Sequence, residues 1–175
     1  MALPGPVLEV GSGPGRDADY PEAQGLPVVR TDASNGFIEY QRSRGKSITP
    51  LNLLRDELGG PYAGLLADAV LLHLQRTQLK DVLVRARGAV VPRGVFALTV
   101  KEGDESSWSS AKLDRPRHFT YWRENEVREV LGRAGWAARA GPRGLGRPLP
   151  AARRRTGRAV ALRSRHGTGL ATSRG

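Results

Sequence analysis

Short apolar runs alternate with longer mixed segments over most of the chain. The runs have the length of β-strands, and most of the segments between them are long enough for a helix. This alternation favours a parallel sheet with helices on both faces, because parallel strands need long crossover connections. The pattern therefore predicts an α/β fold with strands at 7–10, 27–31, 48–53, 62–67 and 95–100.

Two helices are expected where apolar positions recur at helical spacing. The first follows the Asn35-Gly36 turn, takes Ser34 or Asn35 as its N-cap and ends at Gly45. In the second, we expect Thr77 to be the N-cap and 92–94, Pro-Arg-Gly, to end the helix and reverse the chain. The apolar positions of this second helix are Leu79, Val82, Leu83, Ala86 and Val90.

Two further helices are expected at the ends of this region. One covers 125–134, with Val127, Val130 and Leu131 on one face and Gly135 as the C-cap. The other follows the first apolar run, and Pro21 falls about two turns into it. Proline removes a backbone donor and clashes with the preceding turn. We therefore expect this helix either to kink or to restart at Pro21.

The first apolar run leads directly into a glycine-rich turn, 11–15 (Gly-Ser-Gly-Pro-Gly). Asp32 follows the second run about 20 residues further on, where an acid holds a ribose diol in nucleotide-binding folds. Arg16 occupies the position where a dinucleotide-binding turn needs a small residue, which disfavours an NAD(P)-dependent reductase. Glu9 lies in an otherwise apolar strand, where a buried carboxylate is costly unless it meets a cation. The α-ammonium group of S-adenosylmethionine (AdoMet) would supply that cation.

With these motifs in order, the chain resembles the class I AdoMet-dependent methyltransferases, in particular small bacterial methyltransferase-domain proteins. The resemblance covers residues 5–136 and implies a Rossmann-like, mostly parallel sheet. Relatives usually carry an N-terminal helical segment before the first strand and two antiparallel strands at the end. We expect this chain to lack both. The matching segments are 7–17, 28–34, 62–74, 91–103 and 117–122, the last followed by an amphipathic stretch to Trp136.

The resemblance implies a cofactor role for each residue that matches the first two motifs. Glu9 would contact the methionine ammonium group, directly or through water. Gly11, Gly13 and Gly15 would let the backbone pass under the methionine and ribose. Asp32 would accept both ribose hydroxyls, and its alternative role is that of an acid favoured at a helix N-terminus.

Later motifs add residues whose roles are less specific. Asn52 would face the adenine amino group or serve as an ordinary turn residue. Asp68 lies at the end of the fourth strand, near the transferred methyl group, or is simply a strand-end acid. His73 is the candidate general base, since its pKa lies near neutrality, although a His in an apolar run is more often a packing residue. The segments 101–103 (Lys-Glu-Gly) and 121–122 (Tyr-Trp) are further candidates for the acceptor pocket, and ordinary packing explains the two aromatic residues equally well.

The net charge of +11 belongs almost entirely to the C-terminal segment, 137–175. This segment carries 10 of the 28 Lys and Arg residues and no acid, whereas the other 18 are nearly balanced by the 17 Asp and Glu of 1–136. Few large apolar residues occur in 137–175, so we expect a disordered tail beside a methyltransferase domain at 1–136. Only 159–162 could form a strand, and deletion of the tail is expected to leave thermal stability nearly unchanged.

Other classes of protein are disfavoured by composition. There is no Cys, and the three His residues, at 73, 118 and 166, are too far apart to suggest a metal site. Neither an export signal nor an apolar stretch of the roughly 20 residues needed to span a membrane occurs, so we expect a cytoplasmic protein. The resemblance implies an AdoMet-dependent methyltransferase, and we expect a small-molecule acceptor. The alternative is a nucleic-acid-binding protein that acts non-specifically through its basic tail.

Overall fold

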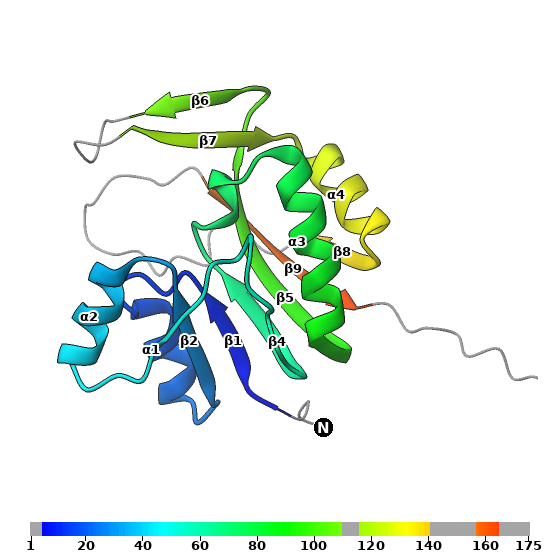
Figure 1. Ribbon diagram of the computed structural model, residues 1–175. Coiled ribbons are helices and arrows are strands. Elements are labelled where there is room, and N and C mark those ends of the chain that lie inside the picture. Colours follow the sequence, from blue (N-terminus) through cyan, green and yellow to red (C-terminus); the bar gives the residue numbers. More distant parts are fainter. Residues whose placement is uncertain (1–4, 110–115, 141–156, 165–175) are drawn as a thin grey trace, which may run out of the picture.

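The structure, a computed structural model, describes residues 5–109, 116–140 and 157–164. Strands and helices alternate along the chain in the order that the apolar runs predicted (Figure 1). The elements are β1 (Val7–Val10), α1 (Arg16–Ala23), β2 (Val28–Asp32), α2 (Asn35–Ser43), β3 (Thr49–Pro50), β4 (Tyr62–Ala67), the 3-10 helix η1 (Leu71–His73), α3 (Arg76–Ala89), β5 (Val90–Glu102), β6 (Ser106–Ser109), β7 (Arg117–Trp122), α4 (Glu124–Arg133), β8 (Trp136–Ala140) and β9 (Gly157–Ser164).

The main sheet has the strand order β3-β2-β1-β4-β5-β9-β8. The first five of these strands are parallel, β9 is antiparallel to β5, and β8 is antiparallel to β9. The order reverses between β1 and β4, which places a topological switch point beside the glycine-rich turn. The expected Rossmann-like, mostly parallel α/β sheet is therefore confirmed.

A hairpin formed by β6 and β7 extends the sheet beyond the end of β4. β4 pairs with β5 only as far as Leu98, whereas β7 pairs with Lys101 and Glu102. Lys101 also pairs with Gly157 of β9, which occupies the opposite edge of β5. The hairpin therefore lies above the carboxyl end of β4, and Figure 1 shows it at the top of the sheet, close to η1.

The apolar core lies between the sheet and the pair α3 and α4. Side chains from β1, β4 and β5 meet those of both helices there, and Trp136 at the start of β8 is completely buried among them. Its indole Nε1 donates to the carbonyl of Leu83 at 2.9 Å, and its ring lies 5.5 Å from that of Phe96. A buried Trp needs such a partner for its N–H, so this contact connects β8 to α3.

The boundaries of α3 differ from the sequence prediction at both ends. Gln75, not Thr77, is the N-cap, and its backbone N–H donates to Gln78 Oε1 at 2.8 Å. Residues 92–94 do not reverse the chain, because β5 already begins at Val90. Arg93 takes a positive φ of 68°, and the register between β4 and β5 shifts near this point. The Pro-Arg-Gly sequence therefore produces an irregularity inside a long strand.

The other predicted helices agree more closely with the structure. α2 follows Ser34 as its N-cap and is succeeded by Gly45 at φ 73°, and α4 is succeeded by Gly135 at φ 82°. α1 includes Pro21 and ends two residues later, at Ala23. The proline thus falls near the end of a short continuous helix, which does not restart at Pro21 as one of the two expectations had it.

The end of the chain differs from the sequence prediction. We expected the final strands to be missing, but β8 and β9 are both present, and β9 pairs with β5 from Val95 to Lys101. The short apolar run 159–162 forms the middle of β9, and backbone pairing extends the strand over its polar neighbours. The disorder expected for 137–175 therefore does not apply to 137–140 or 157–164. The rest of that segment lies outside the described residues.

Pairing of β9 along β5 reverses our expectation for deletion of the tail. A chain that ends at residue 156 loses β9 and exposes an edge of the central strand β5, so its melting temperature should fall by roughly 10 °C or more. A chain that ends at residue 164 keeps both strands and is the matched control. Thermal unfolding followed by circular dichroism measures the difference. Equal melting temperatures for both truncations would show that β9 adds no stability.

Candidate cofactor-binding site

The glycine-rich turn between β1 and α1 has a left-handed backbone at each glycine. The φ values are 68° at Gly11, 53° at Gly13 and 86° at Gly15. A Cβ on Gly11 would lie 2.4 Å from the side chain of Val70, and one on Gly15 would lie 2.5 Å from Arg30 Nη1. A Cβ on Gly13 would meet no described atom within 4 Å. Gly11 and Gly15 are thus required by close packing, and Gly13 by its backbone conformation in open space.

Asp32, at the end of β2, is joined to this turn by hydrogen bonds. Its Oδ2 accepts from the backbone N–H of Gly13 and its Oδ1 from that of Ser34, both at 2.8 Å. The second bond precedes α2, so the alternative role of an acid at a helix N-terminus is also real. A carboxylate offers about four lone-pair positions, which leaves capacity for two ligand hydroxyls.

Glu9, in β1, is a buried carboxylate whose hydrogen bonding is incomplete. The residue is 2% exposed, and its Oε2 has no hydrogen-bond partner among the described residues. Burial and the nearby Asp17 raise the pKa of Glu9 to about 7, although Arg30 acts in the opposite direction. An unpaired buried oxygen of this kind favours a ligand that brings a positive charge.

Arg30, in β2, was not predicted from the sequence. Its side chain holds the glycine-rich turn in place through hydrogen bonds. Arg30 pairs with Glu9 in the β1–β2 register and is 3% exposed. Its guanidinium donates to Asp19 at 2.6 Å, to both carboxylate oxygens of Glu22 at 2.7 Å and to the carbonyl of Gly15 at 2.9 Å. The same bonds lower the pKa of Glu22 to about 2. A lone Arg in an apolar run, with acids spaced along the preceding helix, was the available signal.

Gln41, on α2, completes this network and was also missed. The residue is completely buried, and its Oε1 accepts from Arg30 Nη1 at 3.2 Å. Its Nε2 donates to the carbonyl of Gly13 at 2.9 Å. Two carbonyls of the turn, those of Gly13 and Gly15, are therefore bound by buried side chains from β2 and α2. The shape of the turn is consequently determined by tertiary contacts as well as by its glycines.

Asn52 and Asp68 have local partners in the structure. Asn52 Oδ1 accepts from the backbone N–H of Leu54 at 3.0 Å, as in an ordinary Asx-turn. Asp68 Oδ1 accepts from Thr99 Oγ1 at 2.8 Å, and the same hydroxyl accepts from the N–H of Ala69 at 2.7 Å. These contacts support the structural alternatives for both residues, and their roles toward a cofactor stay predictions.

His73 lies at the end of η1, against the β6–β7 hairpin. Its Nδ1 is 2.8 Å from the carbonyl oxygen of His118, and its ring centroid is 4.7 Å from that of Phe119. Because a carbonyl only accepts, Nδ1 must carry the proton, and Nε2 of the neutral ring keeps its lone pair. Burial lowers the pKa of His73, and the positive charges of Arg117 and Lys101 act in the same direction. The ring is therefore neutral at neutral pH.

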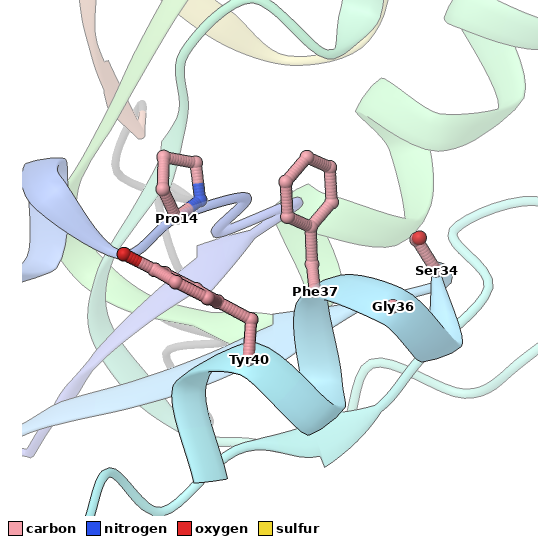
Figure 2. Close-up of a pocket in the computed structure, with 5 residues that line it drawn as sticks. All are labelled: Pro14, Ser34, Gly36, Phe37 and Tyr40. Atoms are coloured by element: carbon pink, nitrogen blue, oxygen red, sulfur yellow. The ribbon is translucent and has the colours of Figure 1, made fainter. Parts of the chain in front are cut away.

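A pocket of about 420 Å³ opens between Pro14 of the glycine-rich turn and the first half of α2 (Figure 2). Pro14 and Ser34, two of its lining residues, adjoin the two hydrogen bonds that Asp32 accepts. Figure 2 shows Pro14 facing the rings of Phe37 and Tyr40 on α2. These rings are 44% and 48% exposed, so an apolar wall is available next to the ribose-binding candidate. Gly36 also lines the pocket.

Solved structures of methyltransferases resemble this chain closely in fold. An AdoMet-dependent methyltransferase from Mesorhizobium loti has a TM-score of 0.71 at 14% identity, with 93% of each chain covered. Another from Methanosarcina mazei has a TM-score of 0.75 at 10% identity, with 94% of each chain covered. The chain therefore has the class I methyltransferase fold.

A third methyltransferase structure holds both a ligand and a cofactor product. It is the 1,6-didemethyltoxoflavin-N1-methyltransferase of Burkholderia thailandensis, with bound 1,6-didemethyltoxoflavin and S-adenosylhomocysteine. Its TM-score is 0.67 at 22% identity, with 92% of this chain and 71% of that chain covered. No family model and no curated protein sequence matches the chain.

Among the described residues, no group of three or more His, Cys, Asp or Glu side chains is arranged to hold a metal ion. In the same residues, no helix is both long enough and apolar enough to cross a membrane.

Replacement of Gly15 by Ala should destabilise the protein more than replacement of Gly45 by Ala. Both glycines have a left-handed φ, which costs an L-residue about 1–2 kcal/mol. Only the Gly15 position adds a clash, with Arg30 and Gln41, which should cost about 1–3 kcal/mol more. Urea unfolding measures both variants. Equal losses would mean that the Arg30 network adapts freely to the added methyl group.

The raised pKa of Glu9 should make stability pH-dependent. The folded protein holds this proton more tightly than the unfolded chain, so the stabilisation is complete below the ordinary pKa of 4.5 and is lost as the pH rises through about 7. Glu9→Gln removes the charge at nearly constant shape and should stabilise the ligand-free protein by about 3 kcal/mol near pH 8. Near pH 4 the gain should vanish. Thermal melts across this range test the prediction, and a gain independent of pH would contradict it.

Proposed function

We propose that this protein binds AdoMet and transfers its methyl group to an acceptor. The observation that carries the proposal is the pair of buried acids at the carboxyl ends of β1 and β2. Glu9 keeps an unpaired oxygen there, and Asp32 keeps free lone pairs beside the glycine-rich turn. A ligand with an ammonium group and a ribose diol fits both acids, and this position on a doubly wound sheet is the usual one for such ligands.

The residues present fit AdoMet without further groups. Glu9 would bind the ammonium group and Asp32 the ribose hydroxyls, while Gly13 leaves open space above the turn. The pocket between Pro14 and α2, with Phe37 and Tyr40, offers apolar contact to the adenosine. The cofactor supplies an electrophilic methyl group on a sulfonium that is a good leaving group.

The reaction asks mainly for alignment of the acceptor by the chain. Displacement at a sulfonium needs the nucleophile in line with the methyl group, so positioning supplies most of the rate enhancement. His73 remains the candidate base. Nε2 of its neutral ring has a lone pair, and this atom would take up the proton that the methyl acceptor releases. The proposed acceptor is a small molecule.

The alternative of nucleic-acid binding has less support. It depends on the 10 Arg residues of 137–175, of which Arg139, Arg158 and Arg163 lie in described strands. The described part of 1–136 has nearly balanced charges, so counterion release would have to come from the tail. This alternative stays a hypothesis and is not the function that we propose.

Asp32→Ala tests the proposed cofactor site. Loss of hydrogen bonds to a charged acceptor should weaken binding of S-adenosylhomocysteine by about 1.5–3 kcal/mol, which is roughly 10- to 150-fold. Isothermal titration calorimetry measures the affinity. Asp81→Ala, at an exposed position of α3, is the matched control and should bind as the wild type does.

Two results would contradict the proposed function. One is an unchanged affinity of a folded Asp32→Ala variant for S-adenosylhomocysteine. The other is tight binding of NADH by the wild-type chain without detectable binding of S-adenosylhomocysteine. Both titrations should be done at moderate salt, so that the basic tail contributes little non-specific attraction.

A further inference from the structure

One face of the β6–β7 hairpin combines aromatic rings with positive charge. Side chains alternate along a strand, so Arg117, Phe119 and Tyr121 of β7 lie on the same face. Lys101 pairs with Tyr121 in register and joins this face from β5. His73 packs against Phe119 from below the hairpin. These five residues are called the hairpin face.

Within the hairpin face, the ammonium group of Lys101 contacts two aromatic rings. Lys101 Nζ lies 3.6 Å from the ring centroid of Phe119 and 5.6 Å from that of Tyr121. An ammonium group so close to an aromatic face is held by the ring quadrupole and leaves its outer side able to meet an anion. Neither Lys101 nor Arg117 forms an ion pair with a residue that the structure describes.

One acid shares the hairpin face, and two others nearby are paired elsewhere. Glu105 lies opposite Tyr121, because its carbonyl accepts from the N–H of Tyr121 at 3.1 Å and continues the antiparallel register of β6 and β7. Asp104, in the connection between β5 and β6, pairs with Arg123. Glu126 on α4 pairs with Arg76, which lies over the ring of Trp122. Lys101 and Arg117 therefore outnumber the one acid, Glu105, on the hairpin face, which lies above the carboxyl end of β4 (Figure 1) and keeps a net positive charge.

We infer that the hairpin face binds the methyl acceptor, and that this acceptor is an aromatic compound with an anionic oxygen group such as a carboxylate. Tyr121 would stack on the ring, while Lys101, held over Phe119, and Arg117 would bind the anion. The inference rests on the proposed function only where it calls the ligand a methyl acceptor. The preference for an anionic aromatic ligand over a neutral one depends on the hairpin face alone.

A matched pair of probes isolates the charge. 2-Naphthoate and 2-naphthamide share one ring system, and only the first carries an anionic carboxylate. Equilibrium dialysis against the full chain, in the presence of S-adenosylhomocysteine, should show at least fivefold tighter binding of the naphthoate. Equal binding of the two probes, or no binding of either, would overturn the inference.

Variants then assign the preference to particular cations. Lys101→Met keeps the apolar stem and should abolish most of the preference for naphthoate, whereas Lys101→Arg should retain it. Lys80→Met, at an exposed position of α3, is the charge-matched control and should behave as the wild type does. Arg117→Met provides a second variant at an exposed position, so the test survives if Lys101→Met fails to fold. A preference that persists in both Met variants would overturn the inference.

Failure of this inference and failure of the proposed function give different results. Affinity for S-adenosylhomocysteine, measured on the same variants, should not change, because Lys101 and Arg117 lie away from the acids of β1 and β2. Normal binding of S-adenosylhomocysteine without a preference for naphthoate would reject only the acceptor class. Absence of S-adenosylhomocysteine binding would reject the proposed function, whichever probe is preferred.

Discussion

The cofactor-binding site depends on the ion pairs and hydrogen bonds of the buried Arg30 guanidinium. The guanidinium joins β2 to α1 through two acids, and it binds the Gly15 carbonyl at the end of the glycine-rich turn. A buried ion pair gains little net stability unless its hydrogen bonds are complete, and here the guanidinium has partners on three elements. Removal of both acids would leave an uncompensated charge under the turn, and removal of one would leave the guanidinium incompletely hydrogen-bonded. The hydrogen bonds of Arg30 therefore hold the glycine-rich turn in one conformation, and a ligand would contact the backbone in that conformation.

The two faces of the sheet around β1 and β2 therefore have different chemistry. Leu8 and Val10 point into the apolar core, whereas Glu9 and Arg30 lie on the opposite face, beside α1. Alternation along the strand produces this division, because successive side chains point to opposite sides. Packing on the core face supplies stability. Polar contacts on the other face supply the conformation of the turn and the unpaired oxygen of Glu9.

Charge is also divided along the carboxyl edge of the sheet. The ends of β1 and β2 present the acids Glu9 and Asp32, while the end of β5 and the hairpin present Lys101 and Arg117. An acidic half suits a cationic cofactor, and a basic half suits an anionic acceptor. Opposite charges on the two ligands would bring them together above the switch point of the sheet, where the order of the strands reverses.

Local sequence patterns determined the order of the elements and the glycine-rich turn. Apolar runs located β1, β2, β4 and β5, and the spacing from the turn to Asp32 predicted the acid that now contacts Gly13. These features depend on side-chain periodicity and on backbone restrictions of single residues, which are local properties. Resemblance to the methyltransferases followed from the same motifs.

Tertiary structure alone decided which residues support the site and how the sheet ends. Arg30 and Gln41 gain their roles from partners 8 to 28 positions away, and an isolated Arg or Gln gives no sign of such a partner. β9 forms because β5 offers an unpaired edge, although few of its own residues favour a strand. The cationic face of the hairpin likewise exists only once β7 lies beside β5. Pairing between distant segments is a property of the folded chain, so the local sequence could not reveal it.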